Sequence, residues 1–184
     1  MSSMLSSLPQ NQRRVLLALW VGFMGSLWFI ALPEGAGWLS ERLGWPTLVV
    51  PGGRTAGYVL LACALGLLLY CSRAFVRLGK GTIVPIDAPR SLVRAGSYRF
   101  SRNPIYVGYV AILVADFIRN GQLGRLIYVL IFFACIQAMI VCLEEPGLRK
   151  RFGSEWDDYA ASVPRWLGPR TSTSSCCLLY TSPS

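Results

Sequence analysis

The sequence predicts an all-α integral membrane protein with four membrane-spanning helices and a C-terminal amphipathic cytosolic helix. Of the 184 residues, 53% are hydrophobic and only 15% are charged, whereas a soluble domain carries roughly a quarter charged residues. Four stretches approach the about 20 apolar residues that a membrane helix needs. The 18 Lys and Arg against 9 Asp and Glu gather on one side of these stretches. The length favours a single membrane domain, over residues 1–170.

The first expected span covers residues 15–32, which carry no charge and follow two arginines. This stretch is long for the apolar region of a signal peptide and lacks a cleavage pattern, so we expect a retained helix. The second span covers residues 56–72. The segment between them, residues 33–53, holds Trp38, Trp45 and Pro46. It favours an interfacial turn anchored by tryptophan, with a fifth short membrane segment as the alternative.

The third and fourth expected spans cover residues 104–118 and 126–143. The third carries Asp116 near one end. It begins at Pro104, a residue suited to the first turn of a helix, with Asn103 as a plausible N-cap. The fourth is bounded by Arg125 and Glu144. Together these two spans form a membrane hairpin.

The basic residues set the orientation of the four spans. Fourteen of the 18 Lys and Arg lie in the N-terminus, the central loop and the C-terminal tail, and the positive-inside rule places that side in the cytoplasm. Both termini are therefore expected in the cytosol. The basic surplus fits contact with anionic lipids and calls for no nucleic-acid partner. The compact length favours a bacterial source, and hence the inner membrane.

The last residues carry no functional argument. Residues 171–176 are polar and of low complexity, so we expect a disordered tail. Residues 177–184 read CLLYTSPS, which matches the translation of a transposase-type sequencing-library adapter. We treat them as an adapter artefact and exclude them.

The chain contains no histidine, which excludes imidazole-based triads, His-containing zinc sites and haem ligation by His. No two cysteines of residues 1–176 stand at C-x-x-C spacing, so we expect no metal site and interpret these cysteines as reduced, apolar packing residues.

Two polar clusters are expected on the cytosolic side. Residues 79–108 are interrupted by glycines and prolines, which predicts a shaped loop rather than a helix. Glu144 and Glu145 end the last apolar helix, where the helix dipole favours cations instead. Pro146 is expected to end or kink that helix, and Gln137 lies two turns earlier on nearly the same face. A salt bridge to the basic central loop and a site for a cationic ligand are both compatible with this pair.

The segment after Pro146 predicts an amphipathic helix. Its apolar stripe, at spacings of four, four and three, consists of Leu148, Phe152, Trp156 and Tyr159. Such a helix either lies along the cytosolic interface or covers the ends of the membrane helices. By itself the stripe is more typical of packing than of binding.

Five motifs in residues 77–170 resemble the isoprenylcysteine carboxyl methyltransferase-like family of membrane proteins, which includes phospholipid N-methyltransferases. They are G-T-x-x-P-x-D-x-P-R (81–90), L-V-x-x-G-x-Y-R (92–99), R-N-P-I-Y-V-G (102–108), E-E-P (144–146) and R-F-G-x-x-W-x-x-Y-x-x-x-V-P-R-W (151–166). Eukaryotic members usually have His where this chain has Asn103. Asparagine donates and accepts hydrogen bonds but does not titrate.

The resemblance implies methyl transfer from S-adenosylmethionine to a lipophilic acceptor that enters from the bilayer at the cytosolic face, such as an isoprenylcysteine carboxylate or a lipid. It assigns catalysis to Arg102 and Asn103. The cofactor-binding residues that it implies are Gly96, Tyr98, Arg102, Asn103, Pro104, Tyr106, Glu144, Glu145, Tyr159 and Arg165. The alternatives are a nicotinamide-dependent membrane reductase of the sterol reductase type, whose chains are much longer, and a non-catalytic membrane scaffold.

Overall fold

The computed structural model describes residues 10–49, 51–79, 92 and 94–168. Every regular element in these residues is a helix, so the predicted all-α class is confirmed there. Outside the helices, an isolated antiparallel β-bridge pairs Thr47 with Gln122. The motif at 81–90, the tail and the suspected adapter segment lie outside the described residues.

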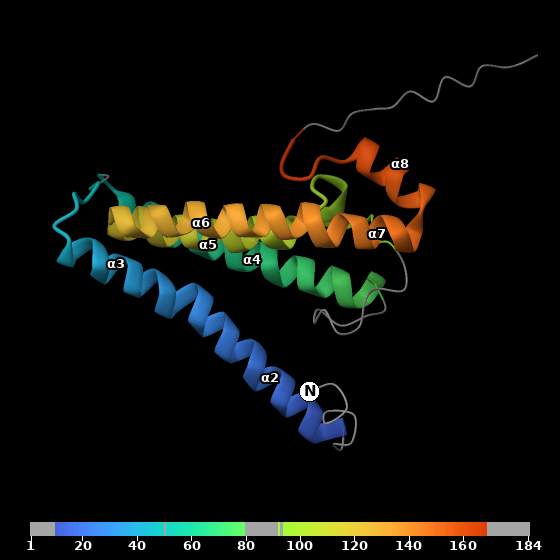
Figure 1. Ribbon diagram of the computed structural model, residues 1–184, viewed down its shortest axis with the longest axis horizontal. Coiled ribbons are helices and arrows are strands. Elements are labelled where there is room, and N and C mark those ends of the chain that lie inside the picture. Colours follow the sequence, from blue (N-terminus) through green and yellow to red (C-terminus); the bar gives the residue numbers. More distant parts are fainter. Residues whose placement is uncertain (1–9, 50, 80–91, 93, 169–184) are drawn as a thin grey trace, which may run out of the picture. The chain divides into compact units, whose positions relative to one another are not determined.

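The helices follow one another in the order shown in Figure 1. They are α2 (Gln10–Ser26), the π-helical turn η1 (Leu27–Ala31), α3 (Leu32–Arg42), α4 (Gly53–Gly79), the 3₁₀ turn η2 (Gly96–Arg99), α5 (Pro104–Asn120), α6 (Leu123–Met139), the π-helical turn η3 (Ile140–Glu144), α7 (Glu145–Phe152) and α8 (Ser154–Ser162).

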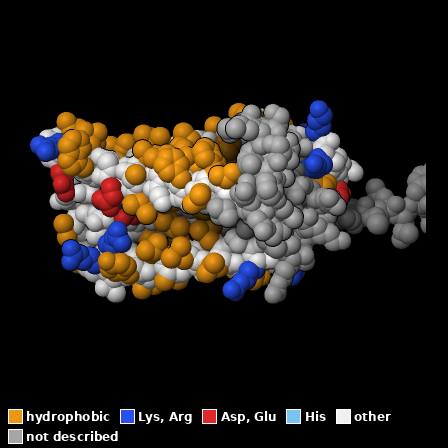
Figure 2. Space-filling view, turned by 90° about the horizontal axis from the view of Figure 1, so that it is seen from below, with side chains coloured by type: hydrophobic (Ala, Val, Ile, Leu, Met, Phe, Trp, Pro, Cys, Tyr) orange, Lys and Arg blue, Asp and Glu red, His pale blue; other side chains and the backbone are white. Residues whose placement is uncertain are grey.

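Three described helical stretches are long and apolar enough to cross a membrane: Leu19–Arg42, Gly53–Arg73 and Leu123–Phe152. Large apolar side chains along them, such as Phe23 and Leu143, are well exposed, and Figure 2 shows hydrophobic side chains over much of one face. Helix α5 begins at Pro104 as predicted, but its 17 residues stand at the lower limit of what a full span needs. The structure thus supports an integral membrane protein with three such stretches, and the predicted count of four or five stays a prediction.

The first helix is longer than the sequence indicated. Helix α2 continues through η1 and α3 to Arg42, so the turn expected over residues 33–53 begins only after Arg42, and Trp38 lies on a helix. Pro33 does not break this helix. Proline lacks an N–H and its ring collides with the carbonyl four residues earlier, and the π-helical turn immediately before it accommodates that change in hydrogen bonding.

The same arrangement recurs at Pro146, where the helix was expected to end or kink, and the helix does not end there. The π-helical turn η3 precedes Glu145, Pro146 is the second residue of α7, and the helix runs on to Phe152. Because a π-helical turn inserts an extra residue, it changes the side of the helix on which Glu144 and Glu145 lie.

The amphipathic helix expected after Pro146 is two helices. Gly153 has a φ of 54°, a left-handed value that glycine adopts readily, and it separates α7 from α8. The predicted stripe nevertheless packs together: Trp156 and Tyr159 are buried beside Val163, with Leu148 and Phe152 against them. The packing interpretation of the stripe is therefore confirmed.

By its contacts the chain divides into two compact units, residues 1–64 with 110–135 and residues 65–109 with 136–184. Helices α4, α5 and α6 each contribute to both units. The prediction of one domain over residues 1–170 is not tested by this division.

In the first unit a buried guanidinium joins three helices. Arg125, at the start of α6, is 5% exposed and pairs with Asp116 of α5 and, at 2.7 Å, with Glu34 of α3. It also donates to Gln122, whose amide donates to Glu41. These groups were separate flanking charges in the sequence. In the folded protein they form one network, in which the carboxylates compensate the buried charge of Arg125.

Small residues allow the helices of this unit to approach closely. The backbone N–H of Gly124 donates to the buried hydroxyl of Ser40 on α3, at 3.2 Å. A Cβ at Gly124 would collide with the carbonyl oxygen of Ala36 and lie 2.9 Å from the Cβ of Ser40. This is the small-residue packing typical of membrane helix pairs.

Replacing Gly124 with alanine is therefore expected to lower the free energy of unfolding by about 2 to 3 kcal/mol, because overpacking against backbone has no easy relief. Thermal unfolding in detergent measures this change. The matched control is Gly66→Ala, where no atom lies within 4 Å of the added methyl, and where alanine should be neutral or stabilising. Equal effects of the two substitutions would contradict the close approach.

Candidate functional site

The site lies in the second unit and centres on Glu145, the first residue of α7. Arg165 binds its carboxylate through two parallel hydrogen bonds, Nε to Oε1 at 2.7 Å and Nη2 to Oε2 at 2.8 Å. Arg102 approaches the same Oε1 with Nη1 at 3.1 Å. Two guanidiniums against one carboxylate leave this cluster with a net positive charge. Hydrogen bonding to Glu145 raises the pKa of Arg165.

Arg102 occupies the short turn between η2 and α5. Its backbone N–H donates to the carbonyl of Pro164 at 2.9 Å, and its guanidinium lies 5.7 Å from the centre of the Trp156 ring. The side chain is only 12% exposed, and this burial lowers the pKa of Arg102, an effect that Glu145 opposes. Its Nε–H is buried and has no partner among the described residues. A buried donor without an acceptor is unusual and calls for an explanation.

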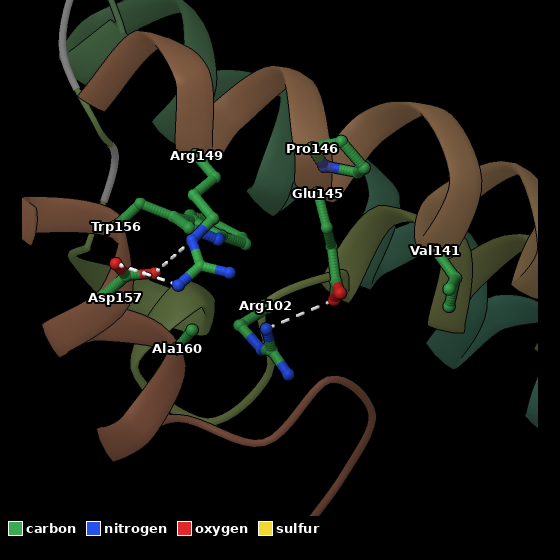
Figure 3. A pocket seen from close by; sticks show the side chains of 8 residues that line it. All are labelled: Arg102, Val141, Glu145, Pro146, Arg149, Trp156, Asp157 and Ala160. Carbon is green, nitrogen blue, oxygen red and sulfur yellow. Dashed lines mark hydrogen bonds and ion pairs between the residues drawn. The ribbon is translucent and has the colours of Figure 1, made fainter. Parts of the chain in front are cut away.

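A cavity of about 400 Å³ opens beside Arg102 (Figure 3). Glu145 lies on its wall together with an Arg149–Asp157 ion pair at 3.0 Å, and Trp156 supplies an aromatic surface. Ligand pockets for small molecules are of this size and combine apolar walls with a few polar groups. The full lining is Arg102, Val141, Glu145, Pro146, Arg149, Trp156, Asp157 and Ala160.

Asn103 and the segment 163–166 form the support of this cavity. The Asn103 side chain is buried and donates through Nδ2 to the carbonyl of Arg165 at 3.1 Å, and Ser101 donates to the same oxygen at 3.3 Å. The Asn103 carbonyl accepts from Val107, and α5 starts at Pro104. Asn103 is thus the residue that precedes the helix, as predicted, but its side chain holds another segment instead of capping it.

Glu144 and Glu145 point in different directions and contact different partners. Successive helical residues point about 100° apart, and the hydroxyl of Tyr106 on α5 donates to Glu144 at 3.0 Å. Glu144 is half-buried and is not part of the cavity wall. The prediction of a paired carboxylate therefore holds for Glu145, which meets Arg102, whereas Glu144 meets a tyrosine.

Three of the remaining predicted residues, Gly96, Tyr98 and Tyr159, make packing and hydrogen-bond contacts within the second unit. The hydroxyl of Tyr159 donates to the carbonyl of Tyr98 at 2.8 Å, and both rings are buried. Burial raises the pKa of Tyr98. Gly96 has a φ of 66°, and a Cβ there would lie 2.9 Å from the hydroxyl of Tyr70. These contacts shape the loop before α5 and place no reactive group in the cavity.

The sequence interpretation missed three features of the site. Trp156 had been noted as part of an apolar stripe, yet it also lines the cavity under Arg102. The Arg149–Asp157 pair across Gly153 was not identified, because the predicted helix was continuous there. The indole of Trp166 donates to Gln137 at 2.9 Å. An isolated Gln inside an apolar helix was the available signal for that contact.

The fold and the site define a helical membrane protein whose polar cavity forms at the end of an apolar helix, next to a half-buried Arg–Glu–Arg cluster. The chain matches the phospholipid methyltransferase family over residues 54–155, more than half of its length, and belongs to that family. The match contains Arg102, Asn103, Glu144 and Glu145. It confirms the resemblance drawn from the motifs and identifies the chain as a membrane methyltransferase. Neither a curated protein nor a solved structure matches the chain.

Proposed function

We propose that this protein transfers a methyl group from S-adenosylmethionine to a lipophilic acceptor at the cytosolic edge of the membrane. The observation that carries the proposal is Arg102: its guanidinium, 12% exposed, lies on the wall of a cavity beside Glu145 in a chain of the phospholipid methyltransferase family, and its Nε–H has no partner among the described residues. Such a donor suits an anionic group.

The residues present fit this cofactor. S-adenosylmethionine carries a carboxylate, for which the guanidinium of Arg102 is suited. It also carries an ammonium and ribose hydroxyls, for which the carboxylates of Glu145 and Asp157 are suited, and an adenine that can lie on Trp156. These groups all lie on the cavity wall, and the cavity volume is within the range of small-ligand sites.

When bound, S-adenosylmethionine supplies a methyl group whose bond to the sulfonium breaks as a bond to an acceptor oxygen or nitrogen forms, with the electron pair left on sulfur. This displacement depends on alignment and on the exclusion of water more than on acid–base catalysis. In the protein, Arg102 orients the ligand, and the side chains of α8 exclude water. A carboxylate acceptor is already ionised at neutral pH, so the absence of histidine is no obstacle.

The acceptor is expected to reach the site from the bilayer. Exposed apolar side chains cover α4, α6 and η3, among them Leu69 of α4 and Leu143 of η3. An amphiphile in the membrane can therefore remain in an apolar environment up to the level of Glu144, which ends the apolar part of the helix. The basic residues of the loop and tail favour a cytosolic position for this end.

The test measures transfer of a labelled methyl group from S-adenosylmethionine into a membrane lipid extract, with purified protein in vesicles. We expect a labelled lipophilic product that requires the wild-type protein and is reduced at least a hundredfold in Glu145→Gln. Lys150→Gln, which alters an exposed cation on α7 outside the cavity, serves as control. Binding of NADPH without binding of S-adenosylmethionine would instead indicate a reductase, and binding of neither would indicate a scaffold.

A further inference from the structure

Residues 163–166 form a strap that joins three separate parts of the second unit. Val163 is buried in the α8 core, and the carbonyls of Pro164 and Arg165 accept from the turn at residues 101–103. The Arg165 side chain binds Glu145, and Trp166 donates to Gln137 of α6. The strap therefore fixes the position of Arg165 from both sides.

The position of Arg165 determines how Arg102 meets Glu145. A carboxylate accepts a guanidinium most favourably through two parallel hydrogen bonds. Arg165 already takes that arrangement, so Arg102 reaches a single oxygen with Nη1 alone. The Nε–H of Arg102 points to the other side of the guanidinium from Nη1 and has no partner among the described residues. Without Arg165, Glu145 would be free to bind Arg102 through two nitrogens and would draw its guanidinium away from the cavity.

We propose that Asn103 is a positioning residue: through the carbonyl of Arg165 it holds the strap in place, so that Arg165 occupies both oxygens of Glu145 and the guanidinium of Arg102 stays on the cavity wall, available to an anionic group of the ligand. This inference rests on the proposed function for the identity of the ligand. It replaces the catalytic role predicted for Asn103, because the amide of Asn103 is engaged with backbone and is not directed at a reacting group.

Two variants separate positioning from chemistry. Asn103→Asp keeps the shape of the side chain but removes the N–H donor, and Asn103→His restores an N–H near the same place. We expect Asn103→Asp to raise the KM for S-adenosylmethionine at least tenfold while kcat changes less than threefold. Asn103→His should restore the KM to within about threefold of wild type. Arg165→Lys, which keeps the charge but loses the two-pronged geometry, should behave like Asn103→Asp.

A readout independent of activity is amide hydrogen exchange in the ligand-free protein. The backbone N–H of Arg102, which donates to Pro164, should exchange faster in Asn103→Asp and at the wild-type rate in Asn103→His. Lys150→Gln is the control for both measurements.

The outcomes distinguish the two proposals. If wild type binds S-adenosylmethionine and Asn103→Asp binds it equally well, or loses kcat at constant KM, the positioning role is overturned and the proposed function stands. If wild type binds no S-adenosylmethionine, the proposed function fails and the ligand part of this inference fails with it, whatever the exchange rates show.

Discussion

Replacing Arg102 with alanine is expected to lower the affinity for S-adenosylmethionine about a hundredfold without unfolding the protein. A hydrogen bond to a charged group contributes about 1.5 to 3 kcal/mol, and about 1.4 kcal/mol corresponds to a factor of ten in affinity. The guanidinium of Arg102, which lies on the cavity wall, supplies the donor that is lost. Titration calorimetry in detergent measures the change.

The fold should survive this substitution for two reasons. The contact between Arg102 and Pro164 uses the backbone, and Glu145 keeps both hydrogen bonds to Arg165. The melting temperature is the check. Arg102→Lys keeps a charge but no guanidinium, and it should still lose at least tenfold in affinity. Unchanged binding in both variants, with Lys150→Ala as the reference, would remove Arg102 from the site.

Replacing Arg125 with methionine is expected to have the largest effect on stability, a loss of about 3 kcal/mol. Breaking a buried pair by removing one partner costs about 3 to 5 kcal/mol, because the other charge remains in a poorly solvated place. The lower end applies here. Asp116 retains Arg119 at 2.9 Å and Asn120 at 3.0 Å, and Glu34 is 59% exposed.

Chemical unfolding in detergent, followed by helical circular dichroism, gives the free energy. Arg42→Met is the matched control, since Arg42 is exposed and lies over the ring of Trp38 at 5.2 Å. Its loss should cost no more than about 1 kcal/mol. Combining Arg125→Met with Asp116→Asn should recover part of the stability, because the uncompensated carboxylate is then neutral. A full additive loss in the double variant would argue against a coupled network.

The chain has two clusters of charged side chains, one around Arg125 and one around Glu145, and they differ in how completely their hydrogen-bond donors are paired. The network around Arg125 joins three helices and gives each nitrogen of its guanidinium a partner. The cluster around Glu145 instead sets two cations against one carboxylate and leaves a buried donor without a partner among the described residues. A buried network whose members are satisfied stabilises the fold, whereas a buried donor without a partner calls for an explanation.

The sequence by itself determined the helical class, the apolar stretches, the start of α5 at Pro104 and the family, because hydropathy, helix-start chemistry and motif spacing are local properties of the chain. It also indicated that the Glu144–Glu145 pair can form a salt bridge to the basic central loop, and Glu145 does so with Arg102. Only the tertiary structure decided that Glu144 turns to Tyr106 and that Asn103 supports the strap.

The physical reason is that these pairings depend on backbone details that have no local signature. The π-helical turn before Pro146 sets the direction of each neighbouring carboxylate. The positive φ of Gly153 separates α7 from α8, after which Trp156 lines the cavity and Arg165 binds Glu145. A shift of one residue in a helix rotates a side chain by about 100°. The pairing of polar side chains far apart in the sequence is therefore determined by how the helices pack, and local sequence alone does not specify it.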